Sequence, residues 1–422
     1  MTARPQSPGA PSGGFVLPPA AADRQTAAGW QQWCTVRDSF VPARRLTRDE
    51  FAQLSPGEQE LFLLHREVTH SNFPLQETPM SRAVARVMRS RLRTGALKHR
   101  PTTRRGLIVN GGGCQGKTET ACEVAAAFEQ SWLELHEHLN PDAVEGARDL
   151  HIPVVYVQTP VTAKPKSTCK AVLDFYGADH NGMDLPALIR AVRRHVHAHG
   201  TRAILLDDIT RLKLHRRDDQ DVFDLLKGFM DMSATLVLIG VDVPGSGLLR
   251  GAVEDPSTGE WIMPSRPGGQ ASQGAETQHQ RRFTMVHLGP FPYDTPDDMA
   301  AFLRHLKGIE DHIRLFDAFP GMLTTGDMPE YLHDRTAGVV GLLECLIEDA
   351  VEAATETGLE KLTIELLEQV EISVERLPGR DATAGEVPAL PKQSPTRAKS
   401  SRPRNRVFDD QGPPPVTGTH AR

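Results

Sequence analysis

The stretch Gly111-Gly112-Gly113-Cys114-Gln115-Gly116-Lys117-Thr118 decides the fold class of this chain. It fits the pattern G-x-x-x-x-G-K-[ST], in which a glycine loop joins a strand to a helix. An apolar run over residues 106–110 precedes it, and an Ala-rich helical pattern over 119–128 follows it. In that context the backbone N–H groups, the positive end of the helix, the Lys117 ammonium and the Thr118 hydroxyl are placed to bind phosphates and Mg²⁺. The alternative is a glycine-rich turn with a chance lysine, and the flanking strand and helix argue against it.

Further apolar runs after this loop predict strands, and helical patterns separate most of them. Strands that alternate with helices predict a parallel α/β sheet between layers of helices, with its sites at the carboxyl edge of the strands. The predicted strands cover residues 152–158, 202–208, 234–240 and 282–288, and the predicted helices cover 185–199 and 222–232. The segment 245–279 is rich in Gly, Ser and Pro, and we predict a long loop there.

The regions on either side of the sheet are predicted to be helical or disordered. Thr47 and Glu50 form a capping box that opens two short helices within residues 47–68. After Pro290 only helical patterns remain, which predicts a small all-α lid. The predicted organisation is a mostly disordered N-terminus (1–40), a basic helical extension (41–105), a nucleotide-binding core (106–293), a helical lid (294–376) and a disordered basic tail (377–422).

The composition is that of a globular protein without a dominant overall charge. The chain has 422 residues, 39% of them hydrophobic, and a formal net charge of −6, so a nucleic-acid site would have to be a local patch. No apolar run approaches the roughly 20 residues of a membrane helix, and we expect a cytoplasmic protein. The five cysteines are scattered, which predicts reduced thiols. Cys114 is either a redox switch or simply a small residue in the loop, and we favour the second.

Two carboxylates, Asp207 and Asp208, end the predicted strand 202–208. Asp207 would hold the metal and Asp208 would orient the attacking water, because hydrolysis of a nucleoside triphosphate needs both functions. An ordinary strand-end turn is the alternative. Arg281 and Arg282, beside the last predicted strand, are candidates to reach the nucleotide of a neighbouring subunit, although a plain surface pair fits the spacing equally well.

A basic segment leads into the glycine loop, since no acidic residue occurs from Thr78 to Thr118. Within it Arg82, Arg86, Arg89 and Arg93 recur at helical spacing and share one face of a predicted helix. That face would attract anions such as DNA phosphates. A solvated basic face is an equally open interpretation, because no aromatic platform accompanies it.

From about residue 82 to 370 the chain resembles the TniB-type AAA+ ATPases of bacterial transposition systems. The resemblance rests on the glycine loop, on Leu205-Leu206-Asp207-Asp208-Ile209, and on Arg281-Arg282-Phe283 leading to Leu288-Gly289-Pro290-Phe291. It also rests on Arg335-Thr336-Ala337-Gly338-Val339-Val340-Gly341-Leu342-Leu343 in the lid. The family's fold is a P-loop AAA+ sheet followed by a helical lid.

This resemblance implies ATP and Mg²⁺ as cofactors, bound through Gly111 to Thr118 and Asp207. It implies Arg281 or Arg282 as the finger or sensor arginine and Arg335 as a candidate lid sensor, and the choice among them stays open. Asp208 stands where the family usually has a glutamate, so we expect either slow turnover or a protein that is chiefly a nucleotide-gated binder. The resemblance further implies a homo-oligomeric ring or filament on double-stranded DNA that serves a DDE transposase. In that setting the loop with Lys213, Arg216 and Arg217 becomes a second DNA contact. The alternative function is a nucleotide-gated signalling or scaffold ATPase that switches protein partners without DNA; a metabolite kinase is disfavoured.

Overall fold

The computed structural model describes residues 21–100, 102–139, 151–160, 164–211, 225–226, 228–246, 253–256, 260–263 and 281–371. The predicted disorder of residues 1–20 and 377–422 lies outside these ranges. So do Lys213, Arg216 and Arg217 of the proposed DNA loop.

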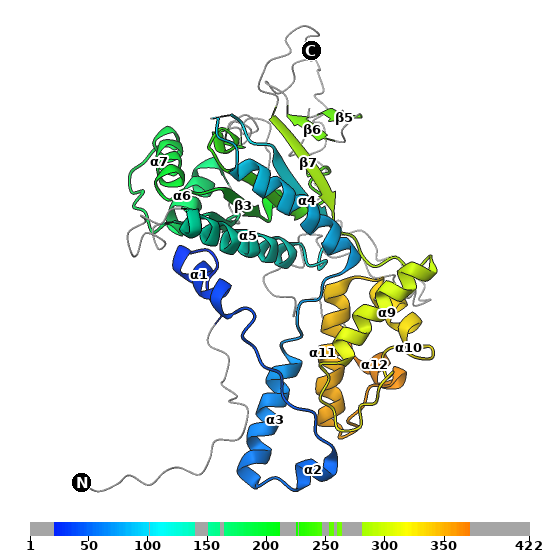
Figure 1. Cartoon of the computed structure of the whole chain (residues 1–422). Coiled ribbons are helices and arrows are strands. Elements are labelled where there is room, and N and C mark those ends of the chain that lie inside the picture. The colour runs from blue at the N-terminus through cyan, green and yellow to red at the C-terminus, as the bar shows by residue number, and fades with distance from the viewer. Residues whose placement is uncertain are drawn as a thin grey trace, which may run out of the picture. The chain divides into compact units, whose positions relative to one another are not determined.

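A mostly parallel sheet forms the centre of the chain, as predicted (Figure 1). Its order is β2-β3-β4-β1-β7-β6-β5. Strands β2, β3, β4, β1 and β7 run parallel, while β6 is antiparallel to β7 and β5 is antiparallel to β6. The strand bounds are β1 (Gly106–Gly111), β2 (Val154–Gln158), β3 (Ala203–Asp207), β4 (Thr235–Val241), β5 (Val253–Asp255), β6 (Glu260–Met263) and β7 (Arg281–His287).

Strands β5 and β6 correct the prediction of a continuous loop over residues 245–279. They are only three and four residues long, which is too short for an alternating pattern to stand out among the surrounding Gly, Ser and Pro. Their pairing extends the sheet beyond β7, with Trp261 opposite Phe283.

Helices cover both faces of the sheet, so its central strands are buried, as is usual for parallel strands. α4 (Pro79–Ala96) packs against α5 (Lys117–Leu139) and touches β1, β4 and β7. α6 (Pro165–Phe175) packs against α7 (Leu185–Ala198) and β2. Val84, Met88 and Leu92 of α4 belong to the hydrophobic core of the sheet. The predicted boundary at residue 105 is therefore wrong for α4, which is part of the core and not of a separate extension.

The C-terminal segment is wholly helical in the described part, as predicted. It comprises α9 (Pro296–Glu310), α10 (Met328–Thr336), α11 (Val340–Glu356) and α12 (Ile364–Gln369). These helices enclose a hydrophobic core of their own around Phe302, Leu332 and Leu346. None of the helices in the described ranges is long and apolar enough to cross a membrane.

The N-terminal region is more ordered than predicted. α1 (Ala27–Val36) lies in a stretch that we expected to be disordered, and its Trp30, only 1% exposed, joins the core of the sheet. Thr26 caps this helix by accepting a hydrogen bond from the Gly29 N–H. α2 (Arg48–Ala52) and α3 (Pro56–His70) are the two short helices expected within residues 47–68, and both carry capping boxes.

Candidate nucleotide-binding site

The glycine loop begins where β1 ends, and its backbone explains why glycine is needed there. A Cβ on Gly111 would lie 2.1 Å from the carbonyl oxygen of Leu288, so no side chain fits at this strand end. Gly116 has a φ of 74°, in the left-handed region that glycine tolerates best. Cys114 also has a positive φ, 59°, which is unusual for a residue with a side chain. The loop therefore turns back on itself and leads directly into α5.

Two side chains of the loop turn inward. The Lys117 side chain is buried, and its Nζ donates a hydrogen bond to the Gly112 carbonyl oxygen at 2.6 Å. The Gln115 Oε1 accepts from the Gly112 N–H at 2.9 Å. The glycine loop is thus closed around the Lys117 side chain, and α5 begins at this residue. A positive side chain and a helix N-terminus that converge in this way suit an anion such as a phosphate.

Asp207, at the end of β3, lies next to the start of α5. Its Oδ2 accepts hydrogen bonds from the Thr118 hydroxyl at 2.7 Å and from the Tyr156 hydroxyl at 2.8 Å. Its Oδ1 accepts from the Asp208 N–H at 2.9 Å. Burial and the neighbouring Asp208 charge raise the pKa of Asp207, and the hydrogen bonds from Thr118, Tyr156 and the Asp208 backbone oppose that rise. A hydroxyl beside a carboxylate is a pair of hard oxygen ligands, so these residues fit Mg²⁺.

Asp208 is partly buried and contacts two polar neighbours. Its Oδ2 accepts from the Gln158 Nε2 at 2.9 Å and is 3.2 Å from an Arg211 Nη2. Arg211 belongs to a short 3₁₀ turn, Ile209–Arg211, that follows β3. The backbone of Asp208 is left-handed, with a φ of 51°. The second predicted carboxylate is therefore fixed near the first, but it is engaged in a polar cluster of its own.

The lid touches the glycine loop directly. The Gly341 N–H, at the start of α11, donates to the Cys114 carbonyl oxygen at 2.8 Å. Cys114, Val339 and Leu342 form a small apolar cluster at this contact. Two acidic residues of α11, Glu344 and Glu348, have pKa values raised to about 7, mainly by burial. The packing of Cys114 favours our interpretation of it as a small residue that fills the loop.

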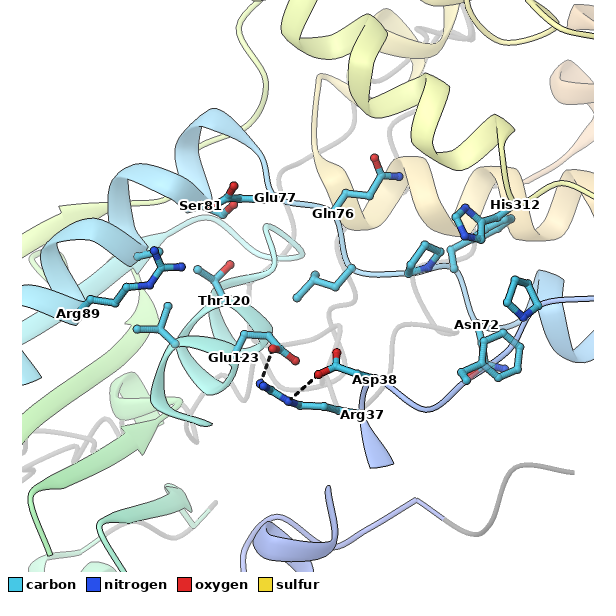
Figure 2. A pocket seen from close by; sticks show the side chains of 17 residues that line it. Arg37, Asp38, Asn72, Gln76, Glu77, Ser81, Arg89, Thr120, Glu123 and His312 are labelled. Atoms are coloured by element: carbon cyan, nitrogen blue, oxygen red, sulfur yellow. Dashed lines mark hydrogen bonds and ion pairs between the residues drawn. The ribbon is translucent and has the colours of Figure 1, made fainter. Parts of the chain in front are cut away.

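A cavity of about 630 Å³ opens beside the first turns of α5 (Figure 2). Thr120 and Glu123 of α5 line it, together with Ser81 of α4 and the connecting segment 72–77. Arg37, which follows α1, also lines the cavity and pairs with Glu123 at 2.6 Å. Thr120 follows Lys117 by about one helical turn, but no residue of the Gly111–Thr118 loop lines the cavity.

The basic face predicted on α4 is present in the helix. Arg82, Arg86, Arg89 and Arg93 are all exposed, whereas Val84, Met88 and Leu92 are buried on the other side. Arg82 pairs with Glu77 at 3.2 Å, which neutralises one end of the face. The exposed side chains of Arg86, Arg89 and Arg93 leave the rest of the face accessible to an anionic partner.

Three predicted arginines are placed less directly. Arg281 and Arg282 begin β7 opposite Met263 and Ile262, and their side chains lie outside the described parts. Arg335 donates from Nη2 to the Val370 carbonyl oxygen at 3.1 Å, within the helical segment.

The sequence analysis did not identify Tyr156 and Arg24 as residues that contact this site. Tyr156 appeared only as a member of an apolar strand, although a hydroxyl at a buried position needs a partner. Arg24 pairs with Glu119 through two hydrogen bonds of 2.9 and 2.8 Å, across 95 residues of sequence. The local sequence signal for a helix in this segment is Thr26, a residue type that caps helices, followed by the apolar residues Trp30 and Trp33.

Residues 100–242 match the family model described as an AAA domain. No curated protein matches the chain. Among solved structures the chain is similar to the Aeropyrum pernix ORC1 protein in complex with DNA, at 14% identity and a TM-score of 0.46, over 72% of this chain and 67% of that one. It is also similar to Cdc6p from Pyrobaculum aerophilum (11%, 0.42, 70% and 67%) and to AMPPCP-bound DnaA from Aquifex aeolicus (13%, 0.34, 70% and 67%). These values are too low to transfer a function.

Proposed function

We propose that this protein is an AAA+ ATPase that binds ATP with Mg²⁺ at the Gly111–Thr118 loop. The observation that carries the proposal is the 2.7 Å contact between Thr118 and Asp207 at the end of a closed glycine loop. It brings a hydroxyl and a carboxylate together beside a buried lysine, as a magnesium nucleotide requires. The match of residues 100–242 to an AAA domain supports the same conclusion.

Each residue has a defined part in this proposal. Lys117 would leave the Gly112 carbonyl and pair with phosphate oxygens, while the backbone N–H groups of the loop bind the same group. Thr118 and Asp207 would hold Mg²⁺, which neutralises charge on the phosphoryl group when it is bound. Asp208 would orient water, and Arg335 or a neighbour's Arg281 or Arg282 would stabilise the transferred charge.

The test of nucleotide binding compares Lys117→Ala with Lys166→Ala, a substitution of an exposed lysine on α6. We expect Lys117→Ala to abolish binding of a fluorescent ATP analogue and Lys166→Ala to leave it unchanged. If the Lys117 variant binds as the wild type does, the loop is not the site.

We further propose that the protein assembles on double-stranded DNA and serves a DDE transposase as regulator or target selector. The exposed basic face of α4 supports a phosphate-binding role, and the resemblance to TniB-type proteins supports the transposase. We also propose the domain limits predicted from the sequence, with α1 and α4 counted as parts of the core.

The DNA test pairs two doubly substituted proteins. Arg89→Gln with Arg93→Gln should weaken DNA binding and lower the slope of log K against log salt by roughly two, because each phosphate contact contributes about 0.9. Arg190→Gln with Arg194→Gln changes two exposed arginines on α7 at the same spacing and should have no effect. Equal losses would remove the assignment to α4. If the wild type shows no salt-sensitive DNA binding with ATP and no DNA-stimulated hydrolysis, the nucleotide-gated switch without DNA is the better function.

A further inference from the structure

We propose that Tyr156 is a positioning residue of the metal site: its hydroxyl fixes the Asp207 carboxylate for Mg²⁺, and the N-terminal segment holds Tyr156 in place. This inference rests on the proposed binding of magnesium ATP. It adds to the nucleotide site an element, α1 (Ala27–Val36), that lies well before the first strand of the sheet, which begins at Gly106.

The hydrogen bonds of Asp207 leave its carboxylate little freedom. An ionised carboxylate has about four lone-pair positions, two on each oxygen. Thr118 and Tyr156 occupy Oδ2, and the Asp208 N–H occupies one position of Oδ1. The remaining position of Oδ1 is the one left for a metal or a metal-bound water. Because Thr118 would itself turn toward the metal, Tyr156 is the side-chain donor whose only task is to hold the carboxylate.

The ring of Tyr156 is fixed by α1. The side chain of Tyr156 is 5% exposed and stacks on Trp30, with ring centroids 6.0 Å apart and an interplanar angle of 18°. Trp30 is anchored in turn, since its Nε1 donates to Glu129 Oε1 at 3.0 Å. The other oxygen of Glu129 accepts from the Val154 N–H at 3.0 Å, at the start of the strand that carries Tyr156. The helix and the strand therefore share one buried carboxylate.

A second contact ties the same segment to the glycine loop. The Arg24 guanidinium lies over the Tyr156 ring, with 5.6 Å from its central carbon to the ring centroid. It also pairs with Glu119, the residue that follows Thr118. The N-terminal segment is thus joined both to Tyr156, which donates to Asp207, and to Glu119, which follows Thr118. Any change that releases α1 should loosen the metal site before it affects the phosphate loop.

The experiment measures binding of a fluorescent ATP analogue to the full chain, once with Mg²⁺ and once with EDTA. The test variant is Tyr156→Phe, which keeps the ring and its stacking on Trp30. The control is Tyr176→Phe, which removes another buried hydroxyl, hydrogen-bonded to Thr201 at 2.7 Å. We expect the gain in affinity produced by Mg²⁺ to fall about tenfold in Tyr156→Phe, with binding in EDTA unchanged. Tyr176→Phe should retain the full gain.

A second variant tests the part played by α1. Trp30→Leu should reduce the gain from Mg²⁺ in the same direction, and the double variant with Tyr156→Phe should lose no more than Tyr156→Phe alone. Such non-additivity is expected if α1 acts through the tyrosine hydroxyl. Additive losses would overturn the role of α1.

The outcomes separate this inference from the proposed function. A wild-type protein that binds no nucleotide would remove both. A wild type that gains affinity with Mg²⁺, together with a Tyr156→Phe protein that gains as much, would overturn the inference alone. Equal loss of binding with and without Mg²⁺ would identify the hydroxyl as merely structural and would also overturn it.

Discussion

Replacing Arg66 by methionine should be among the most destabilising single changes outside the hydrophobic cores. Arg66 on α3 and Glu360 after α11 form an ion pair in which both side chains are almost fully buried, 5% and 6% exposed. The Arg66 Nη1 donates to both carboxylate oxygens, at 3.0 and 2.9 Å. Its guanidinium also lies over the ring of Phe316, 4.7 Å from the centroid. This pair attaches α3 to the helical segment that contains α11.

The expected cost follows from the charge that is left behind. In Arg66→Met the buried Glu360 carboxylate keeps the Phe316 N–H as a donor, at 3.0 Å, but loses its cation. Breaking a buried pair from one side typically costs about 3–5 kcal/mol. Urea unfolding, followed by circular dichroism, should show this loss, and hydrogen exchange should show it in the amides of α3.

The control lies against the same aromatic ring. Arg48 pairs with Asp317 at 2.8 Å and lies over Phe316, but both partners are about half exposed. Arg48→Met should leave the free energy of unfolding nearly unchanged, because solvent screens such a pair. Adding Glu360→Gln to Arg66→Met should recover much of the loss, since the unpaired charge is gone. The reasoning fails if Arg66→Met costs no more than Arg48→Met, or if the double variant is less stable than the single one.

Three further outcomes follow from the geometry. Asp208→Asn should bind ATP normally but release phosphate far more slowly, by on the order of 10²-fold; normal turnover would remove Asp208 as the residue that orients water. Burial raises the pKa of Glu129 to about 7, so its stabilising contribution is complete below the unfolded-state pKa of about 4.5 and is lost as pH rises through 7. Between pH 5 and pH 8 the free energy of unfolding of the wild type should therefore fall by up to about 3 kcal/mol relative to that of Glu129→Gln. Parallel pH profiles of the two proteins in urea unfolding would contradict this. Gly341→Ala would place a Cβ 2.7 Å from the Cys114 carbonyl oxygen, so amides at the start of α11 should exchange faster, whereas Gly289→Ala meets nothing within 4 Å and should behave as wild type.

The sequence was sufficient where the chemistry is local or strictly patterned. The glycine loop and Asp207 were predicted because one is a continuous motif and the other ends an apolar strand. The support behind them was not predictable in the same way. Arg24 and Glu119 are 95 residues apart, and nothing local indicates that they meet. Tyr156 lies in a run of valines, where its hydroxyl carries no periodic signal.

The errors over α1 and α4 have a related cause. α1 is only ten residues long and follows a Pro- and Ala-rich stretch. The composition of that stretch led to a prediction of disorder, although Trp30 and Trp33 pack against the core. α4 was assigned to an extension because its arginines dominate its sequence. Its opposite face, Val84, Met88 and Leu92, completes the core of the sheet. In both cases tertiary packing decided what local composition did not.

The backbone at the end of β3 gives a physical reason for an aspartate where the TniB-type ATPases that the sequence resembles usually have a glutamate. Asp208 adopts a φ of 51°, and Asp242, just beyond β4, adopts 43°. A short polar side chain tolerates the left-handed region better than most residues, because it can form hydrogen bonds locally. Asp208 does so with Gln158 and Arg211. The aspartate that suits this turn has a shorter side chain than a glutamate, and its carboxylate is already bonded to Gln158 and Arg211. Thr118 and Asp207, in contrast, are already in hydrogen-bond contact. If the chain binds a magnesium nucleotide as we propose, Thr118 and Asp207 already lie together in the structure, whereas hydrolysis would require Asp208 to exchange Gln158 and Arg211 for water.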